Sequence, residues 1–80
     1  MKAKIHVTIK NGVLDPQGKA IATALHHLGF KDVVDARQGK YIEVDFLSGT
    51  EKKKATEDVD AMCKKLLANT VIENYKFEIE

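Results

Sequence analysis

Reactive side chains are few in this sequence: three histidines, one cysteine and scattered carboxylates. His26 and His27 are neighbours on a predicted helix and point about 100° apart, while His6 lies on a predicted strand. Because the three imidazoles do not converge and no second group of ligands accompanies them, we expect surface histidines and no metal site. Cys63 falls on the apolar stripe of another predicted helix, where a thiol is expected to be buried and unreactive.

The motifs of common catalytic and binding sites are absent. The sequence has no glycine-rich phosphate loop, no serine nucleophile elbow and no Cys-x-x-Cys metal loop. The net charge is +1 and charges alternate in sign, so we expect neither nucleic acid nor a membrane as a partner. Only Tyr41 is placed to stack on RNA bases. The chain by itself therefore indicates a small binding or assembly module without an active site.

Length and composition indicate one domain, residues 1–80. A chain this short buries only roughly 60% of its unfolded surface, so self-association would add useful burial. The single cysteine excludes an intrachain disulfide, and no apolar run approaches the length of a membrane span. The N-terminus alternates lysines with apolar residues and does not resemble a signal peptide. We therefore expect a soluble cytoplasmic protein.

The segment 12–19 converts a strand into a helix and organises the rest of the chain. Gly12 can adopt the positive φ of a sharp turn, Asp15 is a good N-cap, and Pro16 suits the first helical position. Gly18 would donate its amide to the Asp15 carboxylate, and a glycine inside a first turn often marks a close packing contact. The segment is either such a contact or a simple connector.

Periodicity predicts the remaining elements. Period-two alternation of apolar and polar residues predicts strands over residues 2–10, 40–47 and 74–80. Asp32 to Gln38 form another extended piece. This piece and residues 40–47 are the predicted arms of a hairpin, with a tight reversal at Gly39. Helical spacing predicts a first helix that ends at Gly29 as the left-handed C′ residue. A capping box at residues 48–51, with Thr50 as a rival cap, begins a second helix. The buried stripe of that helix contains Ala55, Val59, Met62, Cys63, Leu66 and Leu67.

This order predicts an α+β, ferredoxin-like βαββαβ sandwich. Two right-handed crossings would place both helices on one face of a four-stranded antiparallel sheet. With the first and third strands central, the open face would carry a polar, mixed-charge set: His6, Thr8, Lys10, Tyr41, Glu43 and Asp45. At the hairpin the only arginine, Arg37, could join Lys40 and Tyr41 in a cationic and aromatic rim, which is either a solvated turn or an interface.

Several motifs, in order and spacing, resemble the PurS family, the small subunit of phosphoribosylformylglycinamidine synthase in purine biosynthesis. They cover almost the whole chain: residues 12–20 (GVLDPQGKA), 24–26 and 28–30 (ALH and LGF), 39–43 (GKYIE), 62–69 (MCKKLLAN) and 71–73 (VIE). Asn11 and Thr70 stand where the family often has proline. These departures change turn stiffness more than chemistry.

The resemblance implies a non-catalytic subunit of a ligase complex. In that family a glutaminase subunit releases ammonia, and a large synthetase subunit uses ATP and Mg to activate formylglycinamide ribonucleotide. The small subunit is thought to join the other two and to assist ammonia transfer, with no cofactor and no catalytic residue of its own. Family members form dimers or pairs of dimers. The matching motifs imply partner contact at two places, Asp15, Pro16, Gln17 and Gly18 at the helix start, and Arg37, Gly39, Lys40 and Tyr41 at the hairpin tip.

Two other functions remain open. One is a regulatory module of the same topology that binds a small effector between paired domains. The other is a small enzyme such as an acylphosphatase-like hydrolase, for which the phosphate-cradling loop is missing.

Overall fold

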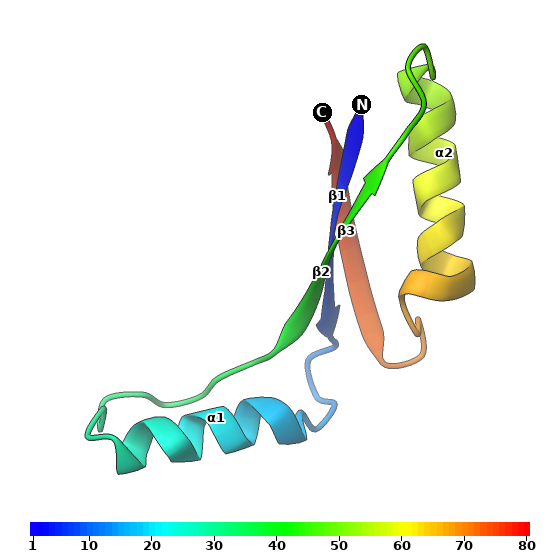
Figure 1. The fold of residues 1–80 in the computed structure, drawn as a ribbon. Coiled ribbons are helices and arrows are strands. Elements are labelled where there is room, and N and C mark those ends of the chain that lie inside the picture. The colour runs from blue at the N-terminus through cyan, green and yellow to red at the C-terminus, as the bar shows by residue number, and fades with distance from the viewer.

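The first strand of the chain is the central strand of its sheet. The computed structural model describes all 80 residues and contains one antiparallel sheet of three strands in the order β2-β1-β3 (Figure 1). The elements in chain order are β1 (Lys2–Ile9), α1 (Pro16–His27), β2 (Gly39–Asp45), α2 (Lys52–Met62), the π-helical turn η1 (Cys63–Leu67) and β3 (Glu73–Ile79).

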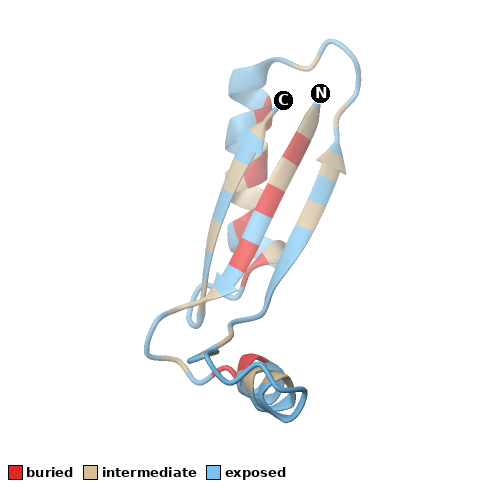
Figure 2. Cartoon of the chain, turned by 90° about the vertical axis from the view of Figure 1, so that its left-hand side faces the viewer, coloured by how far each residue is buried: buried red, intermediate tan, exposed pale blue.

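The core lies on one face of β1, as the alternation of its sequence predicts. Ala3, Ile5 and Val7 are fully buried, and the alternating burial along β1 is visible in Figure 2. Ile5 lies opposite Ile42 of β2 and Phe77 of β3. Because successive side chains point to opposite faces of a sheet, the same register places the apolar residues of all three strands on this face.

Helix α2 and the turn η1 cover this apolar face. Ala55 and Val59 of α2 and Cys63 of η1 are fully buried. The start of α2 differs from the prediction, because Glu51 is the N-cap and its side chain makes no capping hydrogen bond. The Thr50 hydroxyl instead donates to the Leu47 carbonyl at 2.7 Å, so it stabilises the preceding turn. The predicted capping box is therefore wrong.

Helix α1 lies away from the sheet instead of covering it. It projects from the base of β1, and the chain returns along it before entering β2 (Figure 1). The molecule is consequently elongated, with extents of 50 × 24 × 14 Å and a Cα radius of gyration of 16.2 Å, against about 12 Å for a compact chain of this length. Only α2 packs on the sheet, so the predicted pair of helices on one face is wrong for the single chain.

The predicted hairpin is also absent. Residues 32–38 form no strand, and Gly39 is the first residue of β2, opposite Thr8 of β1. Gly39 does not have a positive φ, and the chain runs straight through it without reversing. The sheet of one chain therefore has three strands and not four, and β2 is an edge strand where a central one was expected.

The buried face of β1 predicts a large cost for shortening Ile5. We expect Ile5→Ala to lower the free energy of unfolding by about 2–5 kcal/mol, because the cavity lies in a core too small to collapse around it. Urea unfolding at a fixed protein concentration measures the change. Val71→Ala is the control, because Val71 is 80% exposed. An Ile5→Ala protein as stable as this control would contradict the assignment of the core.

Candidate functional site

The base of α1 is held by one carboxylate that joins two distant parts of the chain. Asp15 is the N-cap of α1, and its Oδ1 accepts the Gly18 amide at 2.9 Å, as the sequence predicts. Its Oδ2 accepts the Gln38 amide, also at 2.9 Å, from the residue just before β2. Asp15 is only 7% exposed, so both bonds are shielded from water. The carboxylate therefore ties the start of α1 to the start of β2.

Two further contacts complete this connection. The Arg37 guanidinium donates to the carbonyls of Ile9 at 2.7 Å and Lys10 at 3.0 Å, at the end of β1. Gly18 lies so close to the returning chain that a Cβ atom there would be 2.1 Å from the Ala36 carbonyl oxygen. We call Asp15, Gly18, Arg37 and Gln38 the clasp, because together they fix the direction in which α1 leaves the sheet.

The clasp also sets the ionisation of Asp15. The amides of Gln38 and Gly18, and then the charge of Arg37, hold the pKa of this carboxyl below its ordinary value of 3.8, while burial acts in the opposite direction. The ionised form is therefore the one that the folded chain favours.

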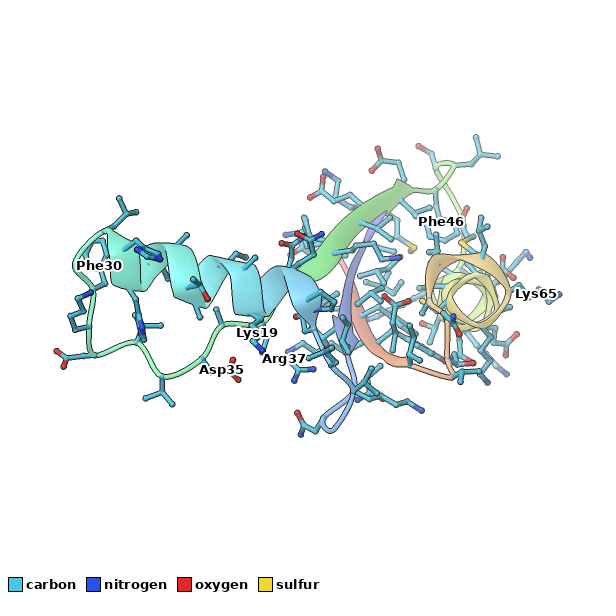
Figure 3. All side chains as sticks on the ribbon, turned by 90° about the horizontal axis from the view of Figure 1, so that it is seen from below. Lys19, Phe30, Asp35, Arg37, Phe46 and Lys65 are labelled. Carbon is cyan, nitrogen blue, oxygen red and sulfur yellow. The ribbon has the colours of Figure 1, made fainter.

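A cavity of about 440 Å³ lies between α1 and the returning segment. Figure 3 shows Lys19, Asp35 and Arg37 gathered on this side of α1. His26 Nε2 lies within hydrogen-bond distance of the Val33 carbonyl, and Arg37 donates a hydrogen bond to the backbone of β1. Thr23 and His26 both line the cavity, but no hydrogen bond joins the Thr23 hydroxyl to the imidazole, which faces the Val33 carbonyl instead. The pair is therefore not arranged as a nucleophile and its base.

The eight residues predicted for partner contact do not form one surface. Asp15, Gly18 and Arg37 meet in the clasp, and Pro16 and Gln17 are exposed in the first turn of α1. Gly39 is a residue of β2. The role of all eight in binding a partner stays a prediction.

The predicted rim of Arg37, Lys40 and Tyr41 is wrong, because their side chains diverge. Lys40 reaches the Leu67 carbonyl at 3.4 Å and Glu73 at 3.8 Å. Tyr41 lies on the open face beside His6, with ring centroids 4.9 Å apart, and its hydroxyl donates to Glu43 at 2.8 Å. Arg37 bonds to the end of β1 instead. The open face is polar, as predicted.

Other titratable groups connect elements of the fold. Asp60 of α2 accepts the Tyr75 hydroxyl of β3 at 2.7 Å and pairs with Lys64 at 2.9 Å. These two contacts hold the pKa of Asp60 below its ordinary value. Cys63 is buried as predicted, and desolvation raises the pKa of its thiol. No group of three or more His, Cys, Asp or Glu side chains is placed to hold a metal ion, and no helix is long and apolar enough to cross a membrane.

One feature of the surface is missed by sequence reasoning. An apolar groove of about 400 Å³ lies between β2 and α2, and its apolar lining consists of Val44, Ala61, Met62, Leu66 and Leu67. Leu66 was predicted to be buried but is 82% exposed. The available signal was the breadth of the predicted apolar stripe, in which the adjacent pairs Met62–Cys63 and Leu66–Leu67 cannot all point in one direction.

Comparison with known proteins assigns the fold and these motifs to a family. Residues 2–80 match the family model described as PurS, phosphoribosylformylglycinamidine (FGAM) synthase. The chain belongs to the PurS family. The PurS subunit of FGAM synthase from Bacillus subtilis is 46% identical over 83 residues, which cover 99% of this chain and 92% of that protein.

Solved PurS structures share the fold over nearly the whole chain. The crystal structure of PurS from Methanocaldococcus jannaschii superposes with a TM-score of 0.86 at 40% identity, covering 99% of this chain and 94% of that one. A chain in the structure of PurLQS from Thermotoga maritima gives a TM-score of 0.76 at 32% identity, covering 96% and 93%. The resemblance noted from the sequence motifs is thereby confirmed.

The contact at Gly18 predicts that even alanine is excluded there. Gly18→Ala would improve helix propensity by about 1 kcal/mol, but its methyl group would collide with the Ala36 carbonyl. We expect a net loss of about 1–3 kcal/mol in the free energy of unfolding, measured by urea unfolding. Thr23→Ala, on the exposed surface of α1, is the control. A Gly18→Ala protein more stable than wild type would exclude the close contact.

The lowered pKa of Asp15 predicts a dependence on pH with a definite sign. As pH falls, the unfolded chain takes up the proton first, so the stabilisation by the carboxylate is present above pH 3.8 and is lost as pH falls through the folded pKa. Asp15→Asn should have a lower urea midpoint than wild type at about pH 6, and the difference should shrink towards about pH 3. Asp32→Asn, at an exposed aspartate, is the control for the change of aspartate to asparagine. A difference that grows on acidification would refute this account.

Proposed function

We propose that this chain is the non-catalytic small subunit of the FGAM synthase complex of purine biosynthesis. It joins the glutaminase subunit to the ATP-dependent synthetase subunit, and it assists transfer of ammonia for conversion of formylglycinamide ribonucleotide to the amidine. The observation that carries the proposal is the match to PurS over residues 2–80. The relative from Methanocaldococcus jannaschii is described as one of the subunits of formylglycinamide ribonucleotide amidotransferase.

The distribution of side chains supports a role in assembly and not in bond making. The side chains of Asp15, Arg37 and Asp60 are engaged in hydrogen bonds within the fold. The buried thiol of Cys63 is protonated at neutral pH because its pKa is raised. In this proposal the chain binds no cofactor, and ATP and Mg are bound by the synthetase subunit.

Ammonia transfer gives such a subunit a physical task. Free ammonia is protonated and diluted when it meets bulk water, so the site that releases it and the site that consumes it must be held in register. A small rigid subunit can hold two large ones in this way. The clasp supplies rigidity where α1 leaves the sheet, since both oxygens of Asp15 are bonded to backbone amides.

The surface also supports self-association as a dimer or tetramer. Large apolar side chains are exposed in and beside α1, in the returning segment and in η1, including Leu14, Leu28, Val34 and Leu66. Exposed apolar side chains that lie together in a patch mark interaction sites in soluble proteins. A homo-oligomer would also increase the buried surface, since only nine of the 80 residues are buried in the single chain.

Recovery of the partner subunits tests the proposal. A tagged chain incubated in its native lysate with glutamine and nucleotide should retain a glutaminase and an ATP-dependent synthetase, identified by mass spectrometry. The purified chain alone should form no amidine and should show no thermal shift with glutamine, glycine or purine nucleotides. Recovery of neither enzyme would overturn the proposal, and a thermal shift with an effector would favour the regulatory module.

Single substitutions locate the contact with the large subunits. Among the residues predicted to face partners, Gln17 and Tyr41 have exposed side chains. We expect Tyr41→Ala or Gln17→Ala to weaken binding of a large subunit about tenfold, since aromatic and polar anchors dominate interfaces. Lys53→Ala, on exposed α2, is the control. If both variants bind as wild type does, the contact lies elsewhere.

A further inference from the structure

The face of the sheet opposite α2 is a broad surface without a covering helix. Helix α2 packs on the face that carries Ile5, and α1 projects away from the base of the sheet (Figure 1). Because side chains alternate along a strand, the open face consists of the even-numbered residues of β1 and β3 and the odd-numbered residues of β2. These positions include no aliphatic side chain. The open face is therefore a polar surface across the whole width of the sheet.

The charges of the open face are sorted along its strands. The row of residues across the sheet at Lys4 contains Glu43 and Glu78, so two carboxylates lie beside one lysine. The next row, at His6, contains Lys76 and no carboxylate. Glu78 and Lys76 are two residues apart on β3, which is about 7 Å along a strand. The charge of the face thus changes from negative to positive over this short distance.

The two residues at this change of sign have no charged partner within the chain. Neither Lys76 nor Glu78 takes part in any of the five ion pairs of the fold, and both residues are exposed. Together with His6 and Phe77 they line a hollow of about 230 Å³. A side chain of another protein that entered this hollow would meet both charges.

Neighbouring side chains on the open face are already fixed. The ring centroids of Tyr41 and His6 are 4.9 Å apart, and the Tyr41 hydroxyl donates to Glu43 at 2.8 Å. Lys4 pairs with Glu80 at 2.9 Å. Side chains that are fixed before binding lose less conformational entropy when a partner binds. Tyr41, which is 50% exposed, is therefore a rigid aromatic anchor of the kind that dominates protein interfaces.

The polarity of the open face indicates what kind of partner it suits. Interfaces between copies of one chain are more apolar than interfaces between proteins that also fold separately. The exposed apolar side chains of this protein, such as Leu28 and Leu66, do not lie on the open face. A polar face with one aromatic anchor and charges of both signs suits a different protein.

We infer that the open face is the docking surface for a larger subunit of the complex, one that presents the same two charges in reverse. A carboxylate of that subunit lies over His6 and Lys76, and a lysine or arginine about 7 Å away lies over Glu78. Electrostatic complementarity of this kind fixes the register of a contact and excludes wrong partners. The inference rests on the proposed function and specifies the surface and the chemistry of the contact.

Exchanging the two charges tests the docking surface. The double variant Lys76→Glu with Glu78→Lys keeps the net charge of the chain but places like charges opposite each other in the contact. We expect its affinity for the docked subunit to fall about 100-fold, because such juxtapositions cost several kcal/mol. Calorimetry with separately purified synthetase and glutaminase subunits, at one salt concentration and with glutamine and nucleotide present, measures the affinity. The matched control is Lys53→Glu with Glu57→Lys on exposed α2, which should bind as wild type does.

Neutral single variants test whether the partner carries both charges. Lys76→Gln and Glu78→Gln should each weaken binding about two- to fivefold, because each removes one exposed ion pair. A face that recognised only an acidic surface would respond differently, since loss of the Glu78 charge would then strengthen binding. Stronger binding by Glu78→Gln therefore overturns the arrangement of two opposite charges. These variants also keep the test decisive if the double variant does not fold, which circular dichroism and urea unfolding show.

The outcomes separate this inference from the function on which it rests. A wild-type chain that binds neither larger subunit overturns both. If the wild-type chain binds and the folded double variant binds equally well, the docking surface lies elsewhere and the inference alone is wrong. Sedimentation velocity gives the remaining readout, because a double variant that loses self-association would assign the open face to contacts between copies. That result would also overturn the inference.

Discussion

The bridge made by the Asp15 carboxylate is the constraint on which the shape of this protein depends. One oxygen caps α1 and the other holds the amide of Gln38, so the start of the first helix and the start of β2 cannot separate. Arg37 adds the end of β1 to the same point. A buried charge needs partners of this kind, because an unpaired carboxylate would be strongly destabilising. The base of α1 is therefore fixed, and the helix projects away from the sheet.

The small core follows from this geometry. With α1 held away, only α2 and the turn η1 that continues it lie on the sheet, and the fully buried side chains come from β1, α2 and η1. The groove beside Leu66, and Leu14 and Leu28 beside α1, remain exposed in a single chain. A single chain with this fold buries little apolar surface, and association with another chain would bury more. The proposed self-association would therefore cover surfaces that the fold of one chain leaves exposed.

The same features fit membership of the PurS family, in which the chain is one subunit of FGAM synthase. Several of its side-chain hydrogen bonds hold elements together, as the Asp60 to Tyr75 bond holds α2 to β3. In the proposed complex the reacting groups come from the larger subunits, and this subunit contributes a fixed shape. That division of roles is physically reasonable, since a chain of 80 residues has little interior in which to exclude water around a reaction.

Features that depend only on residues close together in the sequence could be predicted from it. The alternation of apolar and polar residues predicted which face of β1 is buried. The start of α1 was predicted from Asp15, Pro16 and Gly18. Gly29, with a φ of 103°, fixed its end. Only the tertiary structure decided that the chain runs straight through Gly39, that α1 leaves the sheet and that Leu66 is exposed. The reason is that Asp15 to Gln38 spans 23 residues, and no local periodicity encodes where a side chain will meet so distant an amide.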